Sequence, residues 1–143
     1  MHKVLIVDDD AHVRNLFFNQ FSQFKAIYEI IEAADGEGAR RAIREKSPEV
    51  IFLDVSMPGH IDGFQILKEI RSDSKLKDSL VAMVTAKRNE EETKKARDLG
   101  ANAYFMKPFS PLIVHEWVRS ELKSMKSIGK NYSMNPTPTF DLD

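Results

Sequence analysis

The feature that most constrains the fold of this chain is a fivefold alternation between short apolar runs and longer segments with helical periodicity. The runs are almost continuously apolar rather than alternating, as expected of strands that are buried on both faces of a parallel sheet. Such strands are predicted at Val4–Val7, Tyr28–Glu32, Val50–Leu53, Leu80–Val84 and Ala103–Met106.

Between and after these runs, apolar residues recur every three or four positions, which is the spacing of amphipathic helices. The predicted inward faces are Val13, Leu16, Phe17, Phe21 and Phe24; Ala39, Ala42 and Ile43; Phe64, Leu67 and Ile70; and Val114, Trp117, Val118, Leu122 and Met125. One further helix, which precedes the last strand, is polar and is expected to end at Gly100. The last helix is expected to begin with Ser110 as its N-cap and Pro111 at its first position.

Repeated strand-then-helix units predict a parallel sheet with helices on both faces and right-handed crossovers. We therefore predict an α/β fold of the flavodoxin-like (βα)5 type, a doubly wound parallel sheet with strand order 2-1-3-4-5. Residues 1–126 are expected to form this single domain. Residues 127–143 contain turn-forming residues and no apolar period, so we expect a flexible C-terminal tail there.

Composition and charge narrow the range of functions that the chain could have. The net charge of −1 argues against a domain that binds nucleic acid by bulk electrostatics. No apolar stretch approaches 18 residues, so no membrane span is expected. The chain has no cysteine, which excludes disulfides and thiolate metal sites. A cytoplasmic protein is the simplest expectation.

Charged and hydroxyl residues stand where four of the predicted strands end. Asp8-Asp9-Asp10 follow the first strand, Asp54 the third, Thr85 the fourth and Lys107 the fifth. Ligands of open α/β sheets bind beyond the carboxyl ends of the strands, so these side chains are expected to share one site. Each position alone has a simpler explanation, such as a helix cap or a turn residue. Their joint occurrence at one sheet edge favours a functional cluster.

Several carboxylates at close range repel each other, by roughly 4 kcal/mol per pair at an effective dielectric near 20. Such a cluster either takes up protons or binds a cation. All-oxygen ligands select a hard cation, and Mg²⁺ is the common choice. Because Mg²⁺ in proteins often also contacts phosphate oxygens, the cluster indicates phosphate chemistry.

In sequence order, several short motifs resemble the receiver domain of two-component response regulators. They are Val7-Asp8-Asp9, Leu53 to Gly59, Asp62-Gly63, Thr85-Ala86 and Tyr104 to Phe109. The resemblance covers residues 2 to 125 approximately, which is nearly the whole segment that is expected to fold.

The resemblance implies a mechanism. Asp54 would be the phosphoacceptor, phosphorylated by a phosphohistidine on a sensor histidine kinase or histidine phosphotransfer protein. Asp9 and Asp54 would ligate Mg²⁺ directly, Asp8 through a water, and Ser56 through its backbone carbonyl. Lys107 and Thr85 would contact the phosphoryl oxygens. The chain would act as a switch and not as an enzyme with its own substrate, beyond catalysing its own phosphotransfer and dephosphorylation.

The resemblance also implies a conformational switch and an output surface. After phosphorylation Thr85 would move toward the phosphoryl group and Tyr104 would turn inward. The Lys107-Pro108 peptide is expected to be cis. The output surface would be formed by the fourth helix, fifth strand and fifth helix, and a protein partner or a second copy would dock there. Basic residues on these elements are Lys94, Lys95, Arg97, Lys123 and Lys126.

One segment departs from the family pattern. Gly59, His60 and Ile61 stand between Pro58 and Asp62, one residue more than usual, so the loop after the third strand is expected to be bulged or longer. His60 is interpreted as an exposed loop residue. Ser56 and Lys87 occupy positions that vary in the family and tune the lifetime of the phosphoryl group.

Two alternatives stay open at this point. A phosphatase of the haloacid-dehalogenase type also uses an Asp nucleophile, Mg²⁺, Thr and Lys at strand ends. In such a phosphatase a second Asp stands two residues after the nucleophile. If Asp54 were the nucleophile, that position would be Ser56, which does not match. If Asp8 were the nucleophile, Asp10 would match, but only because three aspartates are adjacent. The chain could also be either a stand-alone receiver or part of a longer protein.

Overall fold

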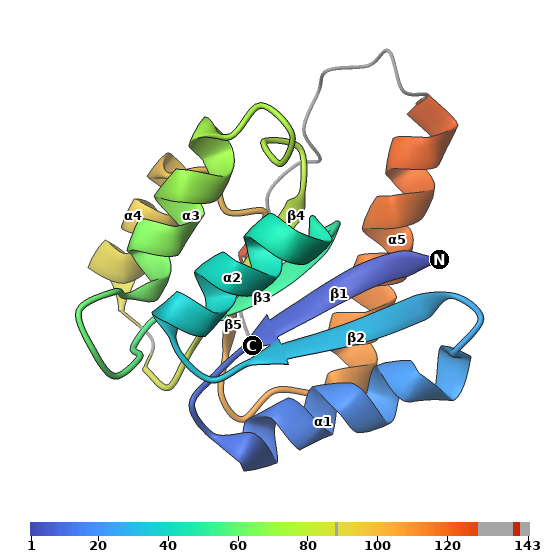
Figure 1. Ribbon diagram of the computed structural model, residues 1–143, viewed down its shortest axis with the longest axis horizontal. Coiled ribbons are helices and arrows are strands. Elements are labelled where there is room, and N and C mark those ends of the chain that lie inside the picture. The colour runs from blue at the N-terminus through green and yellow to red at the C-terminus, as the bar shows by residue number, and fades with distance from the viewer. Residues whose placement is uncertain (88, 129–138, 141–143) are drawn as a thin grey trace.

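The structure is a computed structural model that describes residues 1–87, 89–128 and 139–140 (Figure 1). Its strands are β1 (His2–Val7), β2 (Tyr28–Ala33), β3 (Val50–Asp54), β4 (Leu80–Thr85), β5 (Ala103–Met106) and β6 (Thr139–Phe140). Its helices are α1 (Ala11–Phe21), the 3-10 turn η1 (Ser22–Phe24), α2 (Gly36–Lys46), α3 (Gly63–Ser72), α4 (Glu90–Asp98) and α5 (Pro111–Ile128).

All the described strands lie in one parallel sheet with the order β2-β1-β3-β4-β5-β6. The order of the first five strands, 2-1-3-4-5, confirms the predicted flavodoxin-like fold. β1, β3 and β4 occupy the middle of the sheet, and β3 and β4 are buried along their whole length. This burial accounts for the continuous apolar runs from which these strands were predicted.

Each face of the sheet carries its own hydrophobic cluster. On one face α1 and α5 cover an aromatic cluster that includes Phe17, Phe52 and Trp117. On the other face α2, α3 and α4 cover a mainly aliphatic cluster that includes Leu53, Ile66 and Met83. Figure 1 shows α1 and α5 on the opposite side of the sheet from α2 and α3. The sheet is therefore covered on both faces by buried side chains.

Local capping explains where the helices begin and end. Side chains of Asp10, Asp35, Asp62 and Asn89 accept hydrogen bonds from backbone N–H groups in the first turns of α1, α2, α3 and α4. These bonds satisfy donors that have no partner within the helix. At the other end of α4, the predicted stop Gly100 has φ +95°, which favours glycine.

Two parts of the fold differ from the expectation. Phe24 was placed on the inward face of the first helix, but α1 ends at Phe21 and Phe24 follows in η1 with 38% of its surface exposed. The second concerns residues 127–143. There α5 continues to Ile128 and Thr139–Phe140 form β6, while residues 129–138 and 141–143 lie outside the described residues. The flexible tail therefore stays a prediction.

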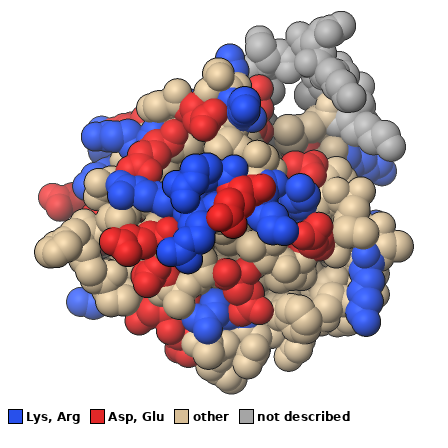
Figure 2. Space-filling model, in the orientation of Figure 1, with Lys and Arg blue, Asp and Glu red and all other residues tan. Residues whose placement is uncertain are grey.

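The surface is mixed in charge. Figure 2 shows Lys and Arg intermingled with Asp and Glu over α2 and α3, in the same orientation as Figure 1. This face carries no extended field of a single sign. Within the described part of the chain, none of the helices is both long enough and apolar enough to cross a bilayer.

Candidate functional site

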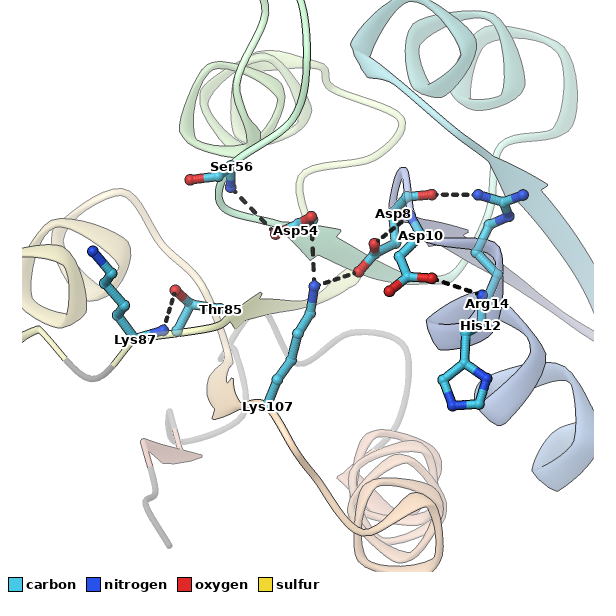
Figure 3. Close-up of polar contacts among 9 residues, drawn as sticks. All are labelled: Asp8, Asp10, His12, Arg14, Asp54, Ser56, Thr85, Lys87 and Lys107. Atoms are coloured by element: carbon cyan, nitrogen blue, oxygen red, sulfur yellow. Dashed lines mark hydrogen bonds and ion pairs between the residues drawn. The ribbon is translucent and has the colours of Figure 1, made fainter.

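The strand register brings the predicted site residues to one edge of the sheet. Val7 pairs with Leu53, so Asp8 and Asp54 follow at equivalent positions on neighbouring strands. Asp54 is paired with Val84, so the next residue along β4 is Thr85. Figure 3 shows Asp8, Asp54 and Lys107 converging from the ends of three different strands.

The carboxylates of Asp8, Asp9 and Asp54 can place one oxygen each within 4.8 Å of one another. Asp8 and Asp54 are 2% and 5% exposed, whereas Asp9 is exposed to solvent. The Lys107 ammonium lies 2.8 Å from Asp8 Oδ2 and 3.6 Å from Asp54 Oδ2. The site is therefore an acidic cluster with one opposing positive charge and one open side.

The electrostatics of Asp54 reflect this crowding. The pKa of its carboxyl is raised from 3.8 to about 6, mainly by burial and secondly by the nearby Asp8 carboxylate. Lys107 and the backbone N–H of Ser56 act in the opposite direction. For Lys107, burial disfavours the charged form, but its contacts with Asp8 and Asp54 outweigh burial and raise its pKa. A divalent cation among the carboxylates would oppose the same repulsion that raises the pKa of Asp54.

The backbone around Asp54 is tightly fixed. The Ser56 N–H donates to Asp54 Oδ1 at 3.2 Å, and the Val55 N–H donates to the Val84 carbonyl at 2.9 Å. A Cβ added at Gly63 would lie 2.3 Å from the Asp54 carbonyl oxygen. Glycine at the start of α3 thus allows the helix to approach the end of β3, which explains part of the Asp62-Gly63 motif.

Thr85 and Lys107 are held next to each other by the sheet. Thr85 is 5% exposed, its carbonyl accepts from the Lys107 N–H at 2.7 Å, and its hydroxyl accepts from the Lys87 N–H at 3.3 Å. The Lys107-Pro108 peptide is cis, as expected. The structure thus assembles Asp8, Asp9, Asp54, Thr85 and Lys107 at one strand edge, where the sequence analysis placed them.

Tyr104, the proposed switch residue, is buried rather than exposed. Only 3% of its surface is accessible, and its hydroxyl donates to Glu92 Oε1 of α4 at 3.2 Å. Burial is the main cause that raises the pKa of this phenol, and hydrogen bonding to Thr85 is a smaller cause that lowers it. The side chain is therefore in the inward position and connects β5 to α4.

Several groups that support the site are not predictable from the sequence pattern. Arg14 of α1 donates to the Asp8 carbonyl at 2.6 Å and pairs with Glu32 Oε1 at 3.0 Å, which braces the loop after β1. An arginine one turn after the N-cap Asp10 is the only signal that the sequence offers. Beside the Asp54 loop, Met57, Phe64 and Lys95 help to line an open hollow of about 440 Å³.

The loop with the extra residue is anchored on α2. A Cβ added at Gly36 would lie 2.5 Å from Ile61 Cβ, so the Ile61 side chain packs directly on the start of α2. Gly59 has φ +95°, and His60 is exposed, as interpreted from the sequence. Ile61 therefore fastens the loop that leads from Asp54 to α3.

Comparison with known proteins agrees with this geometry. Residues 4–119 match the sequence profile of the response regulator receiver domain. The alkaline phosphatase synthesis transcriptional regulatory protein PhoP of Bacillus subtilis is 35% identical over 137 residues, covering 92% of this chain and 55% of PhoP. The structure of chemotaxis response regulator CheY4 of Vibrio cholerae has a TM-score of 0.75 at 31% identity, covering 84% of this chain and 98% of CheY4. Response regulator DrrB of Thermotoga maritima has a TM-score of 0.76 at 26% identity, covering 87% and 54%.

The fold and the strand-edge cluster define a receiver domain. The chain belongs to the response regulator receiver domain family, whose members are phosphorylation-dependent switches of two-component signalling. It spans about half the length of the curated relatives that it matches. The haloacid-dehalogenase alternative receives no support from these similarities.

Proposed function

We propose that this domain accepts a phosphoryl group on Asp54 and holds Mg²⁺ through Asp8, Asp9, Asp54 and the Ser56 carbonyl. The observation that carries the proposal is the convergence of three carboxylates and the Lys107 ammonium at the carboxyl ends of β1, β3 and β5. This arrangement suits phosphoryl transfer, which depends on positioning and charge stabilisation.

The residues present fit a hard divalent cation. The donors are all oxygens, three of them come from carboxylates close to one another, and Asp9 leaves the cluster open to solvent. Repulsion from Asp8 is, after burial, a cause that raises the pKa of Asp54, and a cation held among the carboxylates would relieve that repulsion. When bound, Mg²⁺ would neutralise charge on the phosphoryl oxygens.

The reaction then uses few protein groups. A carboxylate oxygen of Asp54 attacks the phosphorus of a phosphohistidine, forming a new P–O bond as the P–N bond breaks, and the histidine leaves with its electron pair. Lys107 already lies 3.6 Å from Asp54, so its ammonium can pair with an equatorial phosphoryl oxygen. Attack requires ionised Asp54. Its pKa is about 6 in the metal-free domain, and Mg²⁺ held among the carboxylates would lower it.

The switch would use Thr85 and Tyr104. The Thr85 hydroxyl accepts a long hydrogen bond of 3.3 Å from the Lys87 N–H and also interacts with the Tyr104 hydroxyl, so a turn toward a phosphoryl oxygen on Asp54 would be felt by Tyr104. Tyr104 already occupies the inward position, bonded to Glu92. Phosphorylation would therefore stabilise an arrangement that is accessible without it, which is a shift of population.

The donor would be a sensor histidine kinase or a histidine phosphotransfer protein. The output would pass through the face formed by α4, β5 and α5, to a protein partner or in a phosphorylation-dependent homodimer. On this face Lys94 pairs with Asp98 at 2.9 Å, and Lys95 lies over the Phe64 ring at 4.6 Å. Lys95 thus leans toward α3, which makes the output face less basic than its sequence suggested.

The test is intact-protein mass spectrometry after incubation with Mg²⁺ and a small-molecule acyl phosphate. We expect the wild type to gain one phosphoryl group, and the gain to disappear when Mg²⁺ is chelated. Lys107→Met should slow the gain by about 10²-fold or more, since one charge-stabilising donor is lost. Asp10→Asn is the matched control, because Asn preserves the N-cap of α1, and it should gain the group like the wild type.

An unmodified wild-type protein with intact acyl phosphate would contradict the proposal. Hydrolysis of the donor that persists in Asp54→Asn would also contradict it, because the phosphoryl group would then be handled elsewhere.

A further inference from the structure

The exposed edge of the sheet next to β5 carries a strand from the C-terminal segment. Thr139 and Phe140 form β6, which pairs in parallel with β5 in the register Ala103↔Thr139 and Tyr104↔Phe140. Without this contact β5 would be the edge strand of the sheet, with one row of backbone groups unpaired. In β5, β6 pairs with the backbone of Tyr104, whose hydroxyl donates to Glu92 of α4.

The hand of the connection distinguishes β6 from the other strands. The steps from β3 to β4 and from β4 to β5 pass over the face of the sheet covered by α3 and α4. The step from β5 to β6 continues in the same direction across the sheet, but α5 covers the opposite face together with α1. The described part of this connection, α5, therefore lies on the face that corresponds to the opposite hand, whereas about 98% of parallel crossovers are right-handed. A short strand with this connection is better suited to reversible binding at the sheet edge than to a permanent place in the folded core.

We propose that the β5 edge is a docking site for an extended segment and that residues 139–140 of the same chain occupy it as a detachable strand. Main-chain pairing supplies such contacts, as in other complexes where a peptide adds a strand to a sheet edge. Only ten residues separate β6 from α5, so the local concentration of the segment is high and a weak contact suffices.

The consequence rests on the proposed function, because β5 lies at the centre of the proposed output face. A partner or second copy that uses the β5 edge must displace β6 first. The C-terminal segment would thus act as an internal competitor for the output face. Phosphorylation chemistry at Asp54 does not depend on it, since β6 pairs at Ala103 and Tyr104 and not at the strand end.

The contact is tested by paramagnetic broadening in the full chain. The protein has no cysteine, so Asp141→Cys provides a single position for a nitroxide label directly after β6. Because β6 is parallel to β5, the label should remove signal most strongly from the amides of Phe105 and Met106, which follow Tyr104. The same label in a Thr139→Pro, Phe140→Pro background is the comparison, because proline cannot donate a backbone hydrogen bond and disrupts strand pairing.

Selective loss of signal at Phe105 and Met106 that recovers in the double-proline protein would support the proposal. Uniform broadening over the surface, or the same pattern in both proteins, would overturn it. Phosphoryl uptake from acyl phosphate, measured on both unlabelled proteins, separates the two proposals. Failure of uptake in the wild type refutes the role of Asp54, while the broadening result still decides whether β6 docks.

Discussion

Asp54 combines burial with nearby negative charge, and this has a consequence for stability as well as for chemistry. Its pKa is raised from 3.8 to about 6 in the folded protein. Between these values the folded protein binds more protons than the unfolded chain. Stability therefore falls as the pH rises from about 4 to about 6, and it stays at the lower level above that range.

Asp54→Asn removes the charge that causes this loss. In buffer with a metal chelator, we expect the variant to be more stable than the wild type at pH 7.5, on the order of 2 kcal/mol, with little difference at pH 4. Urea unfolding at both pH values measures the effect. Asp10→Asn, which changes an exposed carboxylate, should keep the wild-type fall between pH 4 and pH 6. An Asp54→Asn protein with that same fall would show that another group causes it.

Gly63 is the second residue whose identity the site requires. An added methyl group would meet the Asp54 carbonyl at 2.3 Å, so Gly63→Ala must displace either the start of α3 or the end of β3. We expect a loss of about 1–3 kcal/mol in unfolding free energy and slower phosphoryl uptake. In Gly38→Ala the new Cβ would lie 3.1 Å from the Asp35 carboxylate, which is the end of a side chain, and at an ordinary contact distance of 3.4 Å from Ala33 Cβ. This control should change stability much less, and equal losses in the two variants would contradict the steric explanation.

At the scale of secondary structure elements, the two ends of the strands are stabilised differently. The carboxyl ends form the edge that carries the site, and the amino ends form the opposite edge. At the opposite edge, the Arg71 guanidinium of α3 donates to the carbonyls of Gly100, Lys77 and Ser79 at 2.8, 3.0 and 2.8 Å. It also donates to Asn102 Oδ1 at 2.7 Å, an oxygen that accepts from the Val81 N–H as well. One side chain thus connects α3 with the segments that lead into β4 and β5.

Arg71→Ala should therefore destabilise the fold, since several carbonyl groups would lose their donor together. We expect a loss on the order of 3 kcal/mol in urea unfolding. The rate of phosphoryl uptake by the folded variant should stay close to that of the wild type, because Asp54 lies at the carboxyl end of β3, away from the contacts of Arg71. Lys68→Ala, an exposed change on the same helix, serves as the control and should alter stability by less than about 0.5 kcal/mol. A small effect of Arg71→Ala would mean that water replaces the guanidinium without cost.

Most elements were predictable because their signals are local. The continuous apolar runs of β3 and β4 follow from burial on both faces, and Ser110 and Gly100 mark helix ends by backbone chemistry. The end of α1 was missed because Phe24 keeps the helical spacing, although the chain changes to a 3-10 turn after Phe21. Spacing reports which side chains could share a face and not whether the helix continues.

At the scale of the whole molecule, the rule that ligands bind beyond the carboxyl ends of parallel strands predicts from the sequence alone that Asp8, Asp54, Thr85 and Lys107 lie together. The rule holds because parallel strands in register end at one edge. The supporting contacts were not predictable in the same way. The packing of Ile61 on Gly36 and the pairing of β6 with β5 join segments that are distant in sequence. The Arg14 contact with the Asp8 carbonyl is closer in sequence but depends on the direction of a side chain and on the path of the loop after β1. No local pattern encodes such contacts.

The central claim is that Asp54 carries the phosphoryl group, and locating that group on the chain is its most direct test. The protein is phosphorylated with acyl phosphate and Mg²⁺, reduced with borohydride and mapped by peptide mass spectrometry, because borohydride converts an aspartyl phosphate to homoserine. We expect homoserine at position 54 alone, and only in the sample that received both acyl phosphate and Mg²⁺. Homoserine at Asp8 or Asp9 instead, or a phosphoryl group retained on another side chain, would contradict the assignment of Asp54 as the acceptor.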